Sequence, residues 1–80
     1  MAPGREAVET GVRDLLAQVL GVSAERIGPG LSQESEPSWT SLNHLMLISQ
    51  LESQFGVTFS NSEIRELTSY DRIVAKLAGD

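Results

Sequence analysis

The chain has 80 residues, no cysteine and a single histidine, which excludes a disulfide framework, a thiolate metal site and a metal centre built on several histidines. Its eleven acidic residues outnumber its six basic residues, for a formal net charge of −5, and the basic residues form no cluster, so nucleic acid and anionic membranes are disfavoured as partners. This length predicts one small domain, residues 1–80, held together by ordinary apolar packing.

The first predicted element is a helix that follows Pro3 and Gly4 and ends at Gly21, a natural C-terminal stop. Gly11 lies within it and is expected to cost about 1 kcal/mol relative to alanine. Apolar residues recur along it at helical spacing: Val8, Val12, Leu15, Leu16, Val19 and Leu20.

Residues 21–40 form a long connection rich in glycine, proline and serine, which are turn-forming residues. Val22, Ile27 and Leu31 are spaced as anchors that would hold this connection against a core. Connections of this length are uncommon in compact domains and usually serve a function.

A second helix is predicted from about Ser41 to Phe55. Polar residues gather on one side, and apolar residues cover the rest of a wide surface, which predicts a central helix packed on several sides, with His44 on the protein surface. The apolar arc holds Leu45, Ile48, Leu51 and Phe55, with Leu42 at its edge; the polar side holds Asn43, Gln50 and Gln54, flanked by Met46 and Leu47.

Two further helices follow the glycine at position 56 and a short piece, residues 57–59, that could be extended. Ser60 and Glu63 fit a capping box at the start of a short helix, and Thr68 with Asp71 repeats this signal for a last helix that closes at Gly79. The elements together predict an all-α four-helix bundle with one short helix and a long first loop.

Catalytic readings of this sequence fail. Ser41 and His44 are three residues apart on one helix, but no acidic residue is placed to orient the histidine, and a small bundle offers little concavity for an oxyanion hole. Gly28, Pro29 and Gly30 lack the lysine and hydroxyl residue of a phosphate-binding loop. We therefore expect neither an enzyme nor a metal site.

Ser41 still occupies a chemically suitable position. Thr40 can cap the helix, which leaves Ser41 at the first helical position, where the helix dipole favours a negatively charged group by about 0.3–1 kcal/mol. A phosphodiester on Ser41 would be stabilised there. The spacing alone leaves open that Thr40 and Ser41 simply begin a helix.

A family resemblance favours the functional reading. The segment WTSLNHLMLISQLESQFGV, residues 39–57, resembles the Asp-Ser-Leu region of acyl carrier proteins, and "LGVSAERI" and "FSNSEIRELTSYDRIVAKL" resemble flanking helices of that family. The resemblance covers about residues 5–78. It implies a 4′-phosphopantetheine attached covalently to Ser41, whose terminal thiol holds acyl groups as thioesters. Implied partners are a phosphopantetheinyl transferase and enzymes that load and process the acyl group.

The sequence departs from this family in two ways. Thr40 replaces the usual aspartate, which preserves the cap but removes a charge that assists docking of the transferase. The second helix carries one acidic residue, Glu52, so the expected docking surface is neutral and partly apolar: Leu42, Asn43, Met46 and Gln50. Partner affinity should therefore depend weakly on salt.

The Trp-Thr-Ser-Leu form resembles the Trp-Asp-Ser-Leu form of small discrete carriers of specialised, polyketide-like biosynthesis. We also expect a monomer located in the cytoplasm, since neither an export signal nor a long apolar segment is visible. The alternative is a non-modified helical adaptor that binds a partner helix through Met46 and Leu47.

Overall fold

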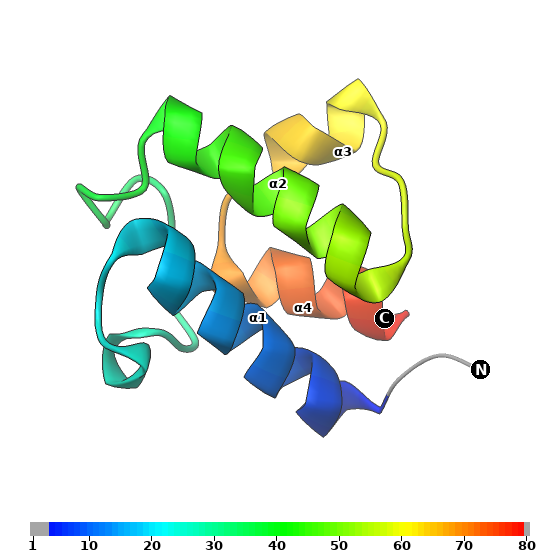
Figure 1. Cartoon of the computed structure of the whole chain (residues 1–80), viewed down its shortest axis with the longest axis horizontal. Coiled ribbons are helices and arrows are strands. Elements are labelled where there is room, and N and C mark those ends of the chain that lie inside the picture. Colours follow the sequence, from blue (N-terminus) through cyan, green and yellow to red (C-terminus); the bar gives the residue numbers. More distant parts are fainter. Residues whose placement is uncertain (1–3, 80) are drawn as a thin grey trace.

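The predicted helices are present in the computed structural model, which describes residues 4–79 (Figure 1). They are α1 (Arg5–Leu20), α2 (Ser41–Phe55), α3 (Asn61–Glu66) and α4 (Tyr70–Ala78), and a short 3₁₀ helix, η1 (Ala24–Arg26), lies within the long first connection. α1 packs against both α2 and α4, which run in the opposite general direction (Figure 1). Within residues 4–79 there is no β-strand, only an isolated bridge between Ser32 and Ser69. The all-α prediction is confirmed.

Most helix boundaries follow the predicted signals. Gly21 and Gly56 end α1 and α2 in the left-handed conformation, with φ of 71° and 65°, which glycine adopts without steric cost. At the start of α3, Ser60 and Glu63 form the reciprocal capping box. The short-range capping rules therefore place these boundaries correctly.

The start of α4 differs from the prediction. Ser69, and not Thr68, is the N-cap, and its hydroxyl accepts the backbone N–H of Arg72 at 3.1 Å. The carbonyl of Thr68 instead accepts the backbone N–H of Gln33 at 2.8 Å. This contact with the long connection holds Thr68 outside the helix, so the helix begins one residue later than the Thr68 signal implies.

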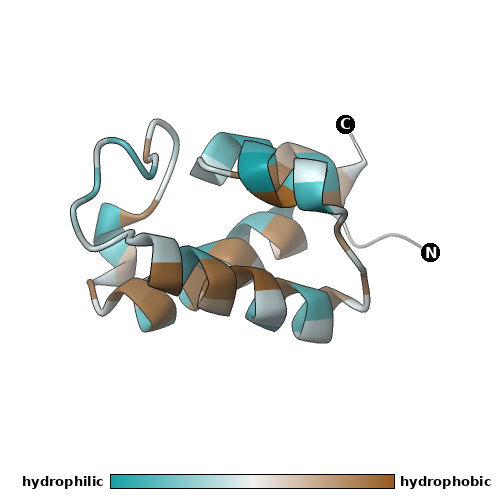
Figure 2. Cartoon of the chain, turned by 90° about the horizontal axis from the view of Figure 1, so that it is seen from above, coloured by the Kyte–Doolittle hydropathy of each residue, from teal (hydrophilic) through white to brown (hydrophobic). Residues whose placement is uncertain are grey.

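The core is a single cluster of buried apolar side chains drawn from α1, α2, α4 and the connecting segments. Apolar and polar residues alternate along the helices (Figure 2), as expected when one face of each helix is buried. The buried members are Val8, Val12, Leu15, Leu16, Leu20, Ile27, Trp39, Leu47, Ile48, Leu51, Phe59, Leu67, Tyr70, Ile73 and Val74.

Gly11 has a packing role that its helix propensity does not show. A Cβ atom at this position would lie 2.9 Å from Cζ of Phe55, which is closer than carbon atoms normally approach. The missing side chain thus allows the end of α2 to pack closely on α1. α1 tolerates the low helix propensity of Gly11 and runs unbroken to Leu20.

The prediction that α2 is packed on several sides is wrong. Its buried residues are His44, Leu47, Ile48 and Leu51, a single stripe at helical spacing. Leu42 and Leu45 are exposed by 68% and 59%, although the sequence placed Leu45 on the core arc and Leu42 at its edge. The neighbouring helices cover only one face of α2, so its remaining apolar residues face solvent.

The long connection between α1 and α2 is fixed to the bundle, as its predicted anchors suggested. Ile27 is buried, and Val22 and Leu31 pack partly buried against the core. The backbone also bonds to the start of α4: Tyr70 N–H donates to the carbonyl of Leu31 at 3.0 Å, and Gly30 N–H donates to Asp71 Oδ2 at 3.1 Å. The connection therefore enters α2 from a defined position.

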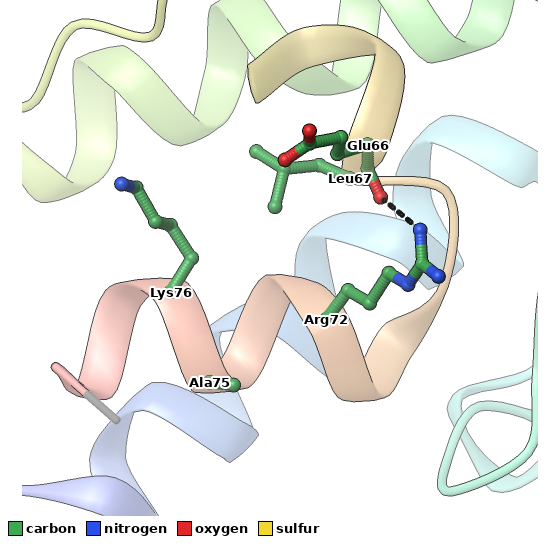
Figure 3. A pocket seen from close by; sticks show the side chains of 5 residues that line it. All are labelled: Glu66, Leu67, Arg72, Ala75 and Lys76. Atoms are coloured by element: carbon green, nitrogen blue, oxygen red, sulfur yellow. Dashed lines mark hydrogen bonds between the residues drawn. The ribbon is translucent and has the colours of Figure 1, made fainter. Parts of the chain in front are cut away.

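The short helix α3 is held from α4. Arg72 reaches from α4 to the backbone carbonyl of Glu66, with a hydrogen bond of 3.2 Å (Figure 3). Lys76 forms an ion pair with Glu63. Hydrogen bonds from Lys76 and from the backbone of Ser60 lower the pKa of the Glu63 carboxyl to about 2. A helix too short to be stable alone is thereby fixed beside α2.

Candidate functional site

Ser41 is the first residue of α2 and is exposed. Thr40 caps the helix as predicted, because its Oγ1 accepts the backbone N–H of Asn43 at 3.1 Å. The first turn of α2 contains no acidic residue. The positive end of the helix dipole at Ser41 therefore has no carboxylate of that turn to offset it.

The turn before Ser41 is fixed by a side chain on the helix that follows. Asn43 Nδ2 donates to the backbone carbonyl of Ser38 at 2.8 Å. Asn43 is half-buried, so this residue, which the sequence assigned to the docking surface, also holds the turn. Its amide thus joins the connection to the first turn of α2.

His44 is buried, which corrects the prediction that it lies on the surface; its exposed fraction is 7%. Nδ1 accepts the indole N–H of Trp39 at 3.0 Å, and Nε2 lies 2.8 Å from the carbonyl oxygen of Ile64. A buried imidazole is stable when both ring nitrogens are hydrogen-bonded. Helical spacing could not show these partners, since one lies before the helix and the other lies on α3.

Ser41 and His44 line one shallow pocket of about 450 Å³ between α2, α3 and the long connection. Arg65 is the one charged residue among its lining residues. The lining is completed by apolar and uncharged polar side chains: Leu45, Ile64, Gln33 and Thr68. The pocket thus combines an exposed hydroxyl, a cation and apolar surface, a combination that suits a group with a phosphate and an apolar part.

The pair Ser41 and His44 does not form a nucleophile and base. Both nitrogens of the His44 ring have other partners, Trp39 and Ile64, so neither is directed to a hydroxyl. Within the described residues, His44 is therefore not available as a base for Ser41. The protein exposes the Ser41 hydroxyl but does not activate it as a nucleophile.

The outer face of α2 next to Ser41 is apolar and exposed. Leu42, Leu45 and Met46 are exposed by 68%, 59% and 49%, and Gln50 is also exposed. These three side chains are neighbours at helical spacing and so form a contiguous exposed apolar patch, the kind of surface that marks interaction sites. The sequence named Leu42 and Met46 for docking but assigned Leu45 to the core.

Several residues that shape this site were missed by the sequence reading. Glu36 is 5% exposed and accepts the side chain of Arg26 at 2.8 Å, while Ile64 and Arg65 reach the pocket from α3. Hydrophobic periodicity could not predict the burial of Glu36, because this acid lies in an irregular segment and its partner, Arg26, lies on η1. Only the fold brings these segments together.

Other hollows on the described surface suit this chemistry less well. One of about 640 Å³ is lined by Glu6, Ala7, Thr10 and Gly11 on α1. Another, of about 470 Å³, lies between α3 and α4, where Glu66, Leu67, Arg72, Ala75 and Lys76 line it (Figure 3). Neither contains a serine. No group of acidic residues and histidine in residues 4–79 is arranged to hold a metal ion.

In the part of the chain that the structure describes, no helix is both long and apolar enough to cross a lipid bilayer. The longest, α1, carries charged residues along its length, among them Arg13 and Asp14.

Comparison with known proteins agrees with the site. A protein-family model described as "Phosphopantetheine attachment site" matches residues 10–77, which include α2, α3, nearly all of α4 and most of α1. No curated protein matched the chain. The matched region contains the exposed serine, its cap and the pocket. The chain therefore belongs to the family of phosphopantetheine-attachment domains, non-catalytic carriers that hold a covalent 4′-phosphopantetheine.

Proposed function

We propose that Ser41 carries the 4′-phosphopantetheine arm and that the protein is an acyl carrier. Of its ten serines, most have hydroxyls engaged in caps or turns: Ser23, Ser32, Ser35, Ser38, Ser60 and Ser69. Ser49, Ser53 and Ser62 are exposed but line none of the described pockets. Ser41 alone joins an exposed hydroxyl to a lining position in a pocket, and this observation carries the proposal.

The residues around Ser41 fit such a group. Attachment would form a bond from the Ser41 oxygen to the phosphorus of the 4′-phosphopantetheinyl group of coenzyme A, break the pyrophosphate bond to adenosine 3′,5′-bisphosphate, which leaves, and release the hydroxyl proton. The phosphodiester would lie at the positive end of α2, where a negative charge is favoured by about 0.3–1 kcal/mol. When bound, the arm supplies a thiol that holds an acyl group as a thioester. The chain has no cysteine, so no protein thiol competes for the acyl group.

Partner enzymes would dock on the outer face of α2. Leu42, Asn43, Met46 and Gln50 form the proposed surface, and the exposure of Leu45 adds it to this set. These partners are a phosphopantetheinyl transferase and enzymes that load and process acyl groups. This surface lies directly beside Ser41, so a partner bound to it would be able to reach the arm.

The residues around Ser41 support a more specific assignment of the type of carrier. We propose that residues 1–80 act as a single carrier domain, as a monomer, in specialised biosynthesis of polyketide type. The sequence Trp39-Thr40-Ser41-Leu42 supports this. The expected cytoplasmic location remains a prediction.

Incubation with coenzyme A and a broad-specificity transferase, followed by mass spectrometry of peptides, tests the attachment site. Wild type and Ser49→Ala, an exposed serine on the same helix, should both gain one phosphopantetheine on the peptide containing Ser41. Ser41→Ala should gain none while it keeps the helical circular dichroism spectrum. Modification of Ser41→Ala at another serine would overturn the assignment, and absence of modification in wild type and in Thr40→Asp alike would favour the adaptor alternative.

A further inference from the structure

A chain of two hydrogen bonds, one buried and one partly buried, joins three segments around Ser41. The indole N–H of Trp39 donates to His44 Nδ1 at 3.0 Å, and the other ring nitrogen of His44 lies 2.8 Å from the carbonyl oxygen of Ile64. A carbonyl oxygen only accepts, so Nε2 carries the proton and Nδ1 is the acceptor. The geometry therefore requires the neutral ring in its Nε2–H tautomer.

The positions of the three residues give this chain a role. Trp39 lies before Ser41 in the long connection and is 2% exposed. His44 lies on α2 after Ser41, and Ile64 lies on α3. The bond from Trp39 to His44 thus closes a short loop of backbone that contains Thr40 and Ser41, and the bond to Ile64 fixes α3 against it.

We propose that His44 is a positioning residue for Ser41. By accepting the Trp39 N–H, it holds the turn at residues 39–41 in the conformation that a phosphopantetheinyl transferase recognises. This inference depends on the proposed attachment at Ser41. The hydrogen bond to Trp39 controls modification of Ser41, whereas the hydrogen bond to Ile64 helps to pack α3.

Two substitutions of His44 separate its two bonds. His44→Asn places an oxygen near the position of Nδ1, which can accept from Trp39 but cannot reach Ile64. His44→Gln places an amide N–H near the position of Nε2, which can donate to Ile64 but leaves the Trp39 N–H without its acceptor. Trp39→Phe removes the donor and keeps an aromatic side chain. Variants of both partners therefore test the same bond.

The measurement is kcat/KM of the transferase for each protein at saturating coenzyme A. Loss of one buried hydrogen bond predicts a decrease of about tenfold for His44→Gln and for Trp39→Phe. His44→Asn should stay within about twofold of wild type. Equal rates in all four proteins would overturn the proposal, as would equal losses in His44→Asn and His44→Gln, which would reveal a packing role only.

Spectroscopy on the wild type tests the hydrogen bonds without any variant. The chain has one histidine and one tryptophan, so the ring ¹⁵N signals and the indole N–H signal are unambiguous. Signals of the Nε2–H tautomer and of a hydrogen-bonded indole N–H are expected; the Nδ1–H tautomer would overturn the proposal. Wild type that shows these signals but is never modified would instead refute the attachment at Ser41.

Discussion

Arg26 donates to the carboxylate of Glu36 across 2.8 Å, joining η1 to the connection that leads to Ser41. The same carboxylate accepts the hydroxyl of Ser38 at 2.8 Å and its backbone N–H at 3.2 Å. The two hydrogen bonds from Ser38, together with the charge of Arg26, lower the pKa of Glu36. One acid thus joins η1, near the start of the long connection, to the residues at its end.

Removal of this acid should loosen the turn before Ser41. In Glu36→Ala, the amide and the hydroxyl of Ser38 lose their acceptor, so we expect faster hydrogen exchange at Ser38 and a lower Tm than in wild type. Glu34→Ala, at an exposed acid in the same connection, is the control and should change neither. Unchanged protection of Ser38 in Glu36→Ala would contradict the described role.

The two faces of α2 should respond oppositely to the same substitution. Leu51 has no exposed surface, so Leu51→Ala should lower the free energy of unfolding by about 2–5 kcal/mol. Leu45 is 59% exposed, so Leu45→Ala should change the free energy of unfolding by less than about 0.5 kcal/mol. Urea unfolding measures both. Similar losses for the two variants would restore the prediction that α2 is packed on several sides.

The sequence was sufficient for the helices because their boundaries are local. Gly21, Gly56 and the capping box of Ser60 and Glu63 act on residues within one turn, so each signal is readable without the fold. The apolar spacing of α1 likewise identifies its buried face. These local rules also placed Thr40 as the cap of α2.

Contacts between distant segments could not be read in this way. His44 looked like a surface residue because its partners, Trp39 and Ile64, lie outside α2. Leu45 looked like a core residue because periodicity shows which residues share a face but not how much of that face the neighbouring helices cover. The same applies to Thr68, whose contact with Gln33 displaced the cap of α4 to the next residue.

The residue at position 40 should affect stability and modification separately. Thr40→Ala removes the acceptor for Asn43 N–H and should cost about 0.5–2 kcal/mol of unfolding free energy. Thr40→Asp keeps an acceptor and adds a negative charge at the start of α2, which the helix dipole favours by about 0.3–1 kcal/mol.

Modification rates complete this comparison. With a generic transferase, Thr40→Asp should be modified faster than wild type, because the added carboxylate supplies the charge usual in acyl carrier proteins. Thr40→Asn, which caps without charge, is the matched control. An unchanged rate in Thr40→Asp would show that the missing charge does not limit docking of the transferase.

Acid should weaken the protein through the capping box of α3. The pKa of Glu63 is lowered from 4.5 to about 2 in the folded protein, so the carboxylate stabilises the fold above the unfolded-state pKa. This contribution is lost as the pH falls from 4.5 towards 2, because the folded state must then bind the proton. In Glu63→Gln, Tm should vary less with pH over this window than in wild type.

Glu66→Gln is the control for this titration, since Glu66 is an exposed acid on the same short helix. Its Tm should follow the wild-type pH dependence. Identical pH profiles for wild type and Glu63→Gln would exclude Glu63 as a source of acid sensitivity.

Binding of partner enzymes should depend on apolar contact more than on charge. Glu52 is the one acid on α2, and its carboxylate accepts the backbone N–H of Phe59 at 2.8 Å. Increasing ionic strength should therefore change partner affinity little, whereas Leu45→Ala should weaken it roughly tenfold through lost apolar burial. Surface plasmon resonance at several salt concentrations measures both. A steep loss of affinity with salt would contradict a neutral docking surface.

The most direct test of the central claim is the intact mass of the purified protein after incubation with coenzyme A and a broad-specificity phosphopantetheinyl transferase. A gain of one phosphopantetheine, absent in Ser41→Ala, is the predicted result. If neither wild type nor Thr40→Asp gained that mass, Ser41 would not be an attachment site, and the carrier function proposed for this chain would be contradicted.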